Sequence, residues 1–164
     1  MIKKINFLFV TLFGVGKIKK IPGSIASLFT ILFLFFLFHI INIDPNIALV
    51  SLIVIFCISL YAVNIYIKDL DDKDPNEIVI DEFVGQSIPI CLYEVAHSEL
   101  KETSEVLTFY FIFFVLFRIF DIVKPYPVSY YDKNFKNSFG VIMDDVCAGL
   151  YVVAVLVLYM VVTT

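Results

Sequence analysis

"IALVSLIVIFCISLYAVNIYI", residues 47–67, is an apolar run of 21 residues that contains no charged side chain. At about 1.5 Å per residue, a helix of this length spans about 31 Å, which is the thickness of the hydrocarbon core of a bilayer. The run therefore predicts a transmembrane helix. It sets the fold class, because the neighbouring segments must be compatible with a membrane.

The composition of the whole chain agrees with this prediction. Of the 164 residues, 60% are hydrophobic and 18 are Phe, and the mean hydropathy is +0.94. Soluble globular domains have an apolar share of roughly half. The length suits one compact domain, and no linker or internal repeat divides the chain. We predict a single all-α, polytopic membrane domain over residues 1–164.

Four further apolar segments accompany the first one. Residues 24–43 and 146–164 are long enough to span a membrane, and a "DPN" turn at 44–46 separates the first of them from the run at 47–67. The runs at 83–93 and 106–117 reach spanning length only if they include charged neighbours. They form either a short re-entrant hairpin or full helices with charged inner ends. We favour full helices, which gives about four to five transmembrane helices.

The distribution of positive charge predicts the orientation. If the N-terminus is cytoplasmic and the segments alternate, the loops at 1–23, 68–82 and 118–145 face the cytoplasm. All of the 12 Lys and Arg residues except Lys101 then lie on the cytoplasmic side, as the positive-inside rule requires. The hairpin alternative places these loops on the same sides, so the charge pattern does not fix the number of spans.

Several functional classes have no support in the sequence. A net charge of −4, without a basic patch interleaved with aromatic residues, argues against nucleic-acid binding. Cys57, Cys91 and Cys147 stand singly in apolar runs and are expected to be small buried hydrophobes. His39 is expected to lie at a helix end or to hydrogen-bond another helix, and His97 to be a solvated loop residue. Neither histidine belongs to a nucleophilic triad.

Two acidic pairs stand at the edges of apolar runs: Asp81 and Glu82 in "IVIDEFVG", and Asp144 and Asp145 in "GVIMDDVCAG". Adjacent carboxylates in apolar surroundings are unfavourable unless a cation offsets them. A helix N-terminus favours negative charge, but one Asp is enough to cap it. We therefore predict that the four carboxylates are oxygen ligands of Mg²⁺, with helix capping as the alternative.

A glycine follows each acidic pair at helical spacing: Gly85 lies three residues after Glu82, and Gly149 lies four after Asp145. Each glycine is expected on the same helix face as its carboxylate. The missing side chain leaves room for a neighbouring helix or for a substrate. Ordinary helix packing explains the glycines as well as a site does.

The only arginine, Arg118, precedes Asp121 by three residues, and Lys124 follows after three more. A helix would bring the carboxylate within reach of both cations. The group is either a structural ion pair or a phosphate clamp in which Asp121 orients the arginine. Pro125 is expected to end this helix. Metal ligands and phosphate-binding cations together suit the hydrolysis or transfer of a lipid phosphate ester.

Three blocks of the sequence match a known family. "GKIKKIPGSIASL" (16–28), "KDLDDKDPNEIVIDEFVG" (68–85) and "FRIFDIVKPYPVSYYDKNFKNSFGVIMDDVCAGLY" (117–151) resemble the signature segments of the bacterial phosphatidylglycerophosphatase A family. The resemblance implies a Mg²⁺-dependent phosphatase of the bacterial inner membrane, with its active site on the cytoplasmic face. Its lipid substrate would be phosphatidylglycerophosphate, and its products phosphatidylglycerol and inorganic phosphate. Asn137 and Ser138 replace a glycine pair usual in the family.

The resemblance also implies roles for individual residues. Asp121 would orient Arg118 or act as a general base. The residues that match the family motifs are Arg118, Asp121 and Lys124 as catalytic residues, Ser24, Lys68 and Asp69 as substrate-binding residues, and Asp81, Glu82, Asp144 and Asp145 as metal ligands, with Asp74 and Asp132 as weaker members.

Two other functions remain as alternatives. A lipid-headgroup phosphotransferase would need a D-x-x-D-G-x-x-A-R motif, which the sequence lacks. A cation carrier would place carboxylates mid-helix along a path, whereas here they crowd at one membrane face. The sequence leaves the oligomeric state open.

Overall fold

The computed structural model describes residues 2–68, 70, 72–73, 75–97 and 102–163. Helices make up all the regular secondary structure in these ranges, as the sequence predicts. In chain order the elements are α1 (Ile2–Val10), the 3-10 helix η1 (Leu12–Lys17), α2 (Pro22–His39), α3 (Pro45–Ile67), α4 (Ile80–Ala96), α5 (Thr103–Val123), α6 (Val128–Asn134) and α7 (Ser138–Thr163).

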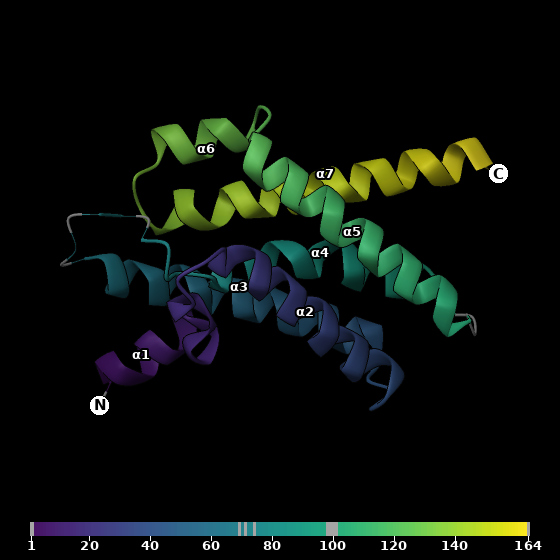
Figure 1. Ribbon diagram of the computed structural model, residues 1–164, viewed down its shortest axis with the longest axis horizontal. Coiled ribbons are helices and arrows are strands. Elements are labelled where there is room, and N and C mark those ends of the chain that lie inside the picture. Colours follow the sequence, from purple (N-terminus) through teal and green to yellow (C-terminus); the bar gives the residue numbers. More distant parts are fainter. Residues whose placement is uncertain (1, 69, 71, 74, 98–101, 164) are drawn as a thin grey trace.

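Four of these helices, α2, α3, α5 and α7, are long and apolar enough to cross a membrane. The helix α4 has 17 residues, or about 26 Å. The two shorter apolar runs of the sequence are therefore full helices, α4 and α5, and not a short hairpin. Figure 1 shows α2 to α5 and α7 running broadly along the long axis, with the two chain ends at opposite ends of the molecule. This placement fits five passes through a membrane.

Local sequence explains several helix ends. The Asp44 carboxylate accepts a hydrogen bond from the Asn46 backbone N–H at 2.7 Å, and Pro45 follows it as the first residue of α3, which is a standard helix start. The helix α5 ends at Val123, where Lys124 adopts the left-handed conformation with φ of 49°. Pro125 then prevents continuation, as predicted.

The last helix begins earlier than the sequence pattern indicates. The predicted span starts at residue 146, whereas α7 starts at Ser138. The Asn137 side chain accepts hydrogen bonds from the backbone N–H groups of Phe139 and Gly140, both at 3.1 Å, and so supplies the cap. Asp144 and Asp145 consequently lie well inside α7, so the helix-capping interpretation of this pair is wrong.

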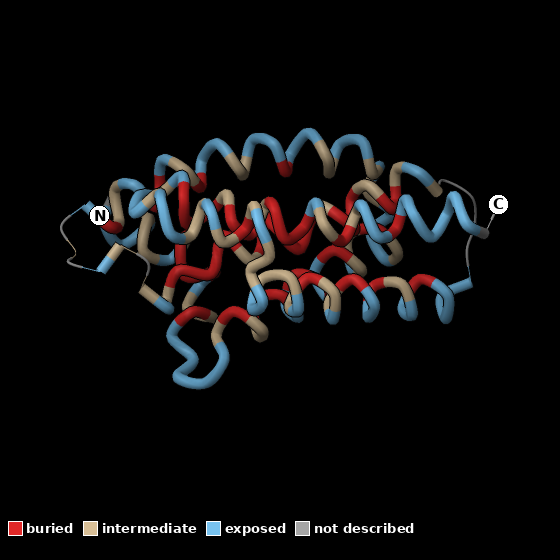
Figure 2. Tube along the Cα trace, turned by 90° about the horizontal axis from the view of Figure 1, so that it is seen from above, coloured by how far each residue is buried: buried red, intermediate tan, exposed pale blue. Residues whose placement is uncertain are grey.

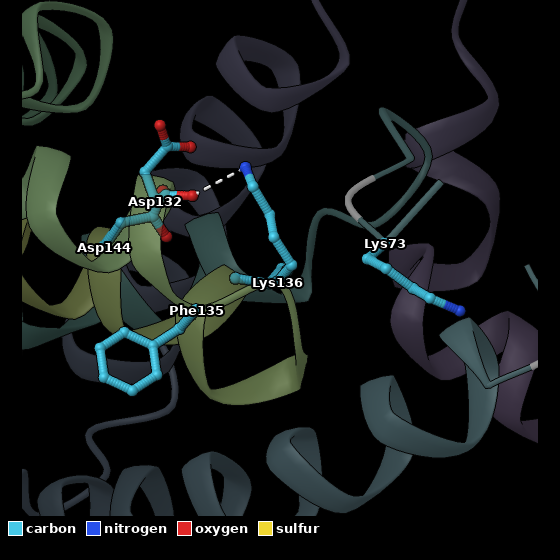
Figure 3. Close-up of a pocket in the computed structure, with 7 residues that line it drawn as sticks. Lys73, Asp132, Phe135, Lys136 and Asp144 are labelled. Carbon is cyan, nitrogen blue, oxygen red and sulfur yellow. Dashed lines mark hydrogen bonds between the residues drawn. The ribbon is translucent and has the colours of Figure 1, made fainter. Parts of the chain in front are cut away.

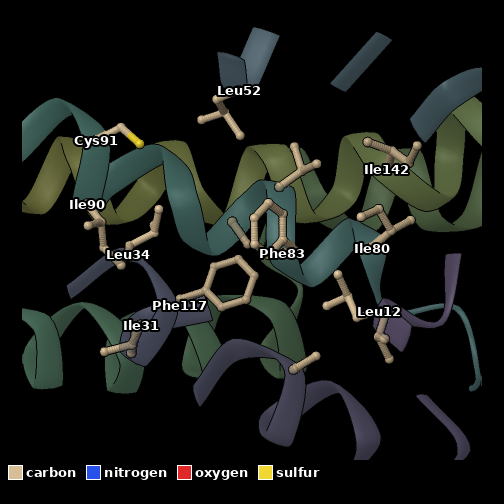
Figure 4. Packing of buried hydrophobic residues seen from close by; sticks show 14 of the residues in the cluster. Leu12, Ile31, Leu34, Leu52, Ile80, Phe83, Ile90, Cys91, Phe117 and Ile142 are labelled. Atoms are coloured by element: carbon tan, nitrogen blue, oxygen red, sulfur yellow. The ribbon is translucent and has the colours of Figure 1, made fainter. Parts of the chain in front are cut away.

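The helix α4 lies at the centre of the bundle. Twelve of its 17 residues are buried, and it contacts α2, α3, α5 and α7. Figure 2 shows the buried residues gathered in the middle and the exposed ones on the outer faces. Figure 4 shows Phe83 and Ile90 of α4 in the apolar core, with Leu34 of α2 and Phe117 of α5. The apolar outer faces are suited to contact with lipid. Cys57 is exposed on α3, so its predicted burial is wrong.

Two glycines allow α4 and α7 to approach closely. A Cβ added to Gly149 would lie 2.3 Å from the carbonyl oxygen of Gly85. A Cβ added to Gly85 would lie 2.5 Å from the carbonyl oxygen of Asp145. The backbones of the two helices are thus in direct contact at these positions, and helix packing is the role the structure gives to the glycines.

Gly149→Ala is expected to lower the free energy of unfolding by about 1–3 kcal/mol, the usual cost of overpacking. The added methyl group would meet the Gly85 carbonyl, and α7 would have to move away from α4. Thermal denaturation in detergent micelles measures the effect, with Ala154→Ser on the exposed face of α7 as the control. A denaturation midpoint equal to that of the unmodified protein would show that the contact is not tight.

A polar contact joins three helices at the far end of α4. The Tyr110 hydroxyl of α5 donates a hydrogen bond to Glu94 Oε1 at 3.0 Å, and His39 Nε2 of α2 lies 3.5 Å from the same oxygen. Glu94 is buried. His39 ends α2 and faces another helix, as expected. His97 is half-buried, and its Nδ1 lies 3.1 Å from the Tyr93 carbonyl oxygen.

Candidate functional site

The opposite end of the bundle contains a cavity of about 270 Å³ in which polar and charged residues predominate. Four helices and one loop meet around it. Its lining residues come from the start of α2, the α3–α4 connection, the first turn of α4, the last two turns of α5 with the following residue, and the first half of α7: Ile21, Pro22, Gly23, Ser24, Asn76, Ile78, Asp81, Glu82, Arg118, Asp121, Ile122, Lys124, Asp144 and Asp145.

Three carboxylates in this cavity form a compact group, here called the carboxylate cluster: Asp81, Glu82 and Asp145. One oxygen atom from each of them lies within 4.8 Å of the other two. Asp81 is 7% exposed and Asp145 is 3% exposed. Glu82 is half-buried. Three carboxylates this close together and largely removed from solvent repel one another strongly unless a cation or bound protons offset their charge.

The carboxylate cluster fits a metal ion. All its potential ligand atoms are carboxylate oxygens, which hard divalent cations such as Mg²⁺ and Ca²⁺ prefer. In addition, Glu82 Oε2 is buried and has no hydrogen-bond partner among the described residues. A buried carboxylate oxygen normally has a partner, and a cation would supply one.

The close approach of α4 and α7 brings the carboxylate cluster together. Gly85 lies one turn after Glu82, and its missing side chain lets the Asp145 backbone come within contact distance. Because successive residues of a helix point about 100° apart, Asp145 and Asp144 face different neighbours. Asp145 joins the pair on α4, whereas Asp144 reaches Lys124.

Arg118 stands beside the carboxylate cluster. Its Nη1 lies 2.7 Å from Asp121 Oδ2 and 3.8 Å from Glu82 Oε1. The buried Nε and Nη1 nevertheless form no aligned hydrogen bond among the described residues. The guanidinium group is thus held beside Asp121 by charge, and its planar set of donors suits an anion such as phosphate.

Gly23 makes room for this contact, and the sequence analysis did not identify it. A Cβ at this position would lie 2.0 Å from Glu82 Oε1 and 3.2 Å from Arg118 Nη1. The "PG" dipeptide at the start of α2 could have indicated this role for Gly23. The sequence analysis instead assigned a substrate-binding role to the neighbouring Ser24, which has a hydroxyl group. Ser24 itself is half-buried and lines the cavity.

Lys124 links α5 to α6 and α7. Its Nζ donates hydrogen bonds to Asp132 Oδ1 at 2.7 Å and to Asp144 Oδ2 at 2.8 Å. Burial disfavours the ammonium form, but the hydrogen bonds and negative charges of these two carboxylates outweigh burial and raise the pKa of Lys124 above its ordinary value. The side chain is therefore a fixed positive charge at the edge of the cavity.

Figure 3 shows the neighbouring pocket, where Asp132 and Asp144 lie near each other. The Lys136 ammonium donates a hydrogen bond to the Asp132 backbone carbonyl at 2.9 Å (Figure 3). Lys73 points away from these carboxylates, and its ammonium donates to the Ile67 carbonyl at 2.9 Å, at the end of α3. Lys73 therefore caps α3 and does not extend the site.

Comparison with known proteins identifies the family. The family model described as phosphatidylglycerophosphatase A matches residues 8–160. The chain belongs to the phosphatidylglycerophosphatase A family. A Haemophilus influenzae member, named phosphatidylglycerophosphatase A, is 32% identical over 143 residues, which cover 87% of this chain and 81% of that protein. An Escherichia coli protein of the same name is 31% identical over 140 residues, covering 84% and 73%.

A third relative, from Bacteroides thetaiotaomicron, has a provisional assignment as a phosphatidylinositol-3-phosphatase. It is 33% identical over 144 residues, which cover 85% of this chain and 83% of that protein. No solved structure matches the chain significantly. The matched residues of the phosphatidylglycerophosphatase A family model include every residue that lines the cavity.

The remaining residues implied by the family resemblance have different positions. Lys68 is exposed at the end of α3 and does not line the cavity. Asp69 and Asp74 lie outside the described residues. Asp132 contacts Lys124 and lies outside the cavity lining. The structure thus separates the residues around the cavity from those at its periphery.

Proposed function

We propose that this protein hydrolyses the terminal phosphate monoester of phosphatidylglycerophosphate, with Mg²⁺ as its cofactor. The observation that supports this most is the buried carboxylate cluster beside an arginine that has unmatched donors, within one cavity. A phosphatase needs a site for a cation and a site for phosphate oxygens in contact with each other. The names of the relatives from Haemophilus influenzae and Escherichia coli support the same activity.

In this proposal Asp81, Glu82 and Asp145 hold the metal ion. When bound, a divalent cation offsets the negative charge that develops on the phosphate oxygens. The four-ligand set expected from the sequence is thereby reduced to three, because Asp144 forms an ion pair with Lys124. Asp144 instead serves to fix the position of that lysine.

Arg118 binds the phosphate oxygens, and Asp121 holds the guanidinium group in place from one helical turn away. Lys124 adds a second positive charge at the cavity edge. In the reaction, the bond from phosphorus to the glycerol oxygen breaks and a bond from a water oxygen to phosphorus forms. The glycerol oxygen takes up a proton, and inorganic phosphate and phosphatidylglycerol are released.

We further propose that the protein lies in the bacterial inner membrane with the cavity on the cytoplasmic side. Every cavity-lining residue except Ser24 belongs to one of the three segments, 1–23, 68–82 and 118–145, for which the charge pattern predicts a cytoplasmic position. Placing the site there gives water and Mg²⁺ direct access to it.

Phosphate release from phosphatidylglycerophosphate by the purified protein tests the activity. We expect release with Mg²⁺, a loss of at least about a hundredfold in EDTA because metal-assisted charge stabilisation is worth several kcal/mol, and recovery when Mg²⁺ is restored. Undiminished release in EDTA would exclude the metal proposal. Phosphatidylinositol 3-phosphate is the comparison substrate: faster release from it would overturn the substrate assignment and leave the phosphatase assignment intact.

A further inference from the structure

Exposure is unevenly distributed among the residues that line the acidic cavity. Three of them are exposed: Ile21, Asn76 and Ile122. The two isoleucines are 68% and 70% exposed. All the charged lining residues are buried or half-buried. The rim of the cavity that is exposed on the surface therefore consists of two apolar side chains and one polar side chain.

Close contacts close the other sides of the cavity. The glycines of α4 and α7 bring those helices into backbone contact. Between α2 and α4, the space at Gly23 is filled by the Glu82 carboxylate. Toward α6 and α7, Lys124 bridges two carboxylates. Between the start of α2 and the end of α5, Gly23 lies close to Arg118, and the two exposed isoleucines stand at these same helix ends.

The position of these isoleucines is defined by the backbone. Ile21 directly precedes α2 and has φ of 49° and ψ of 51°, a left-handed conformation that is unfavourable for a β-branched residue. Ile122 lies in the last turn of α5. Both residues stand at ends of helices that are apolar enough to cross a membrane. Asn76, in contrast, belongs to the connection between α3 and α4.

We propose that the acidic cavity opens sideways toward the membrane between Ile21 and Ile122, here called the lateral opening, and that the lipid substrate reaches the site through it. This inference rests on the proposed phosphatase function. The phosphorylated headgroup lies in the cavity, and the glycerol and acyl portion lies over the two isoleucines. Phosphate leaves on the aqueous side past Asn76. Three exposed lysines precede Ile21 in the sequence and attract anionic lipid: Lys17, Lys19 and Lys20.

The double substitution Ile21→Gln with Ile122→Gln tests the lateral opening. Surface-dilution kinetics in mixed micelles give the KM, as a mole fraction, and the kcat for long-chain phosphatidylglycerophosphate. We expect KM to rise about tenfold, because the substitutions remove apolar burial against the lipid equivalent to about one or two methylene groups. The kcat is expected to change by less than about twofold, because neither isoleucine touches the reacting phosphate.

A deacylated substrate, glycerophosphoglycerophosphate, separates the lateral opening from the chemistry. Its turnover by the double variant is expected to equal that of the unmodified protein. Ile5→Gln, at a position on α1 that is 60% exposed and outside the cavity, is the matched control and is expected to leave KM unchanged. The two single variants, each with a smaller rise in KM, provide the test if the double variant folds poorly.

The outcomes distinguish the two proposals. An unchanged lipid KM, a fall in kcat without a rise in KM, or equal losses on both substrates would overturn the lateral opening while leaving the phosphatase assignment in place. If the unmodified protein releases phosphate from neither substrate, the proposed function is wrong and the lateral opening falls with it.

Discussion

Asp145→Asn is expected to reduce phosphate release from phosphatidylglycerophosphate by about a thousandfold, the scale on which charge stabilisation in a buried site contributes to rate. Asp145 is 3% exposed and is the only member of the carboxylate cluster on α7. The amide keeps the size of the side chain but removes one negative charge from the proposed metal site. The measurement is kcat/KM as a function of Mg²⁺ concentration, and the Mg²⁺ concentration for half-maximal activity should also rise.

Protein stability separates this loss from misfolding. In EDTA, Asp145→Asn should raise the denaturation midpoint, because it relieves repulsion among three closely spaced carboxylates. Addition of Mg²⁺ should stabilise the unmodified protein but have little effect on the variant, since a ligand stabilises only the state that binds it. A variant with normal activity and normal stabilisation by Mg²⁺ would exclude Asp145 as a ligand.

Two matched substitutions sharpen the comparison. Asp144→Asn alters the neighbouring carboxylate, which contacts Lys124, and is expected to lower activity by only about tenfold, as for a residue that orients another group. Glu94→Gln alters a buried carboxylate at the far end of α4 and should leave kcat unchanged. Equal losses in Asp144→Asn and Asp145→Asn would contradict the distinction between the two aspartates.

Arg118→Lys is expected to lower kcat/KM by about a hundredfold or more, although the charge is conserved. Arginine presents a planar set of donors to two phosphate oxygens at once, whereas lysine provides a single charged point on a flexible chain. The buried Nε and Nη1 of Arg118 have no aligned hydrogen-bond acceptor among the described residues, so we expect the guanidinium group to donate hydrogen bonds to the phosphate. Inhibition by inorganic phosphate should weaken in parallel, which tests binding separately from turnover.

Lys133→Gln is the control for the arginine substitution, because Lys133 is exposed on α6 and does not line the cavity. It should leave kcat/KM and phosphate inhibition unchanged. If Arg118→Lys retained both properties as well, Arg118 would have only a structural role through Asp121. That result would favour the structural ion pair that the sequence analysis gave as the alternative to a phosphate clamp.

The sequence predicted the membrane fold from local properties. The apolar run at 47–67 corresponds closely to α3, and the two shorter runs are the full helices α4 and α5. Pro125 follows the end of α5 as expected. The start of α7 was missed because a cap made by the Asn137 side chain allows a helix to begin before its continuously apolar part.

The two acidic pairs show what the local sequence could not predict, namely the separate partners of adjacent carboxylates. The sequence indicated that Asp81, Glu82, Asp144 and Asp145 are costly to bury and need cations, since that cost depends on residue type and apolar surroundings. The sequence analysis assigned Asp144 and Asp145 the same role, as ligands of one metal site. In the structure, Asp144 forms an ion pair with Lys124, and Asp145 joins the carboxylate cluster.

By itself, the sequence determined the membrane class, the predicted orientation and the kinds of residue that gather at one end of the bundle, because hydropathy and charge are properties of each segment. Only the tertiary structure decided which carboxylate meets which partner. That choice depends on the rotation of each helix about its axis, which for α4 and α7 must allow the backbone contact between Gly85 and Gly149. Neighbouring residues on a helix point about 100° apart, so adjacent aspartates face different sides of the same site.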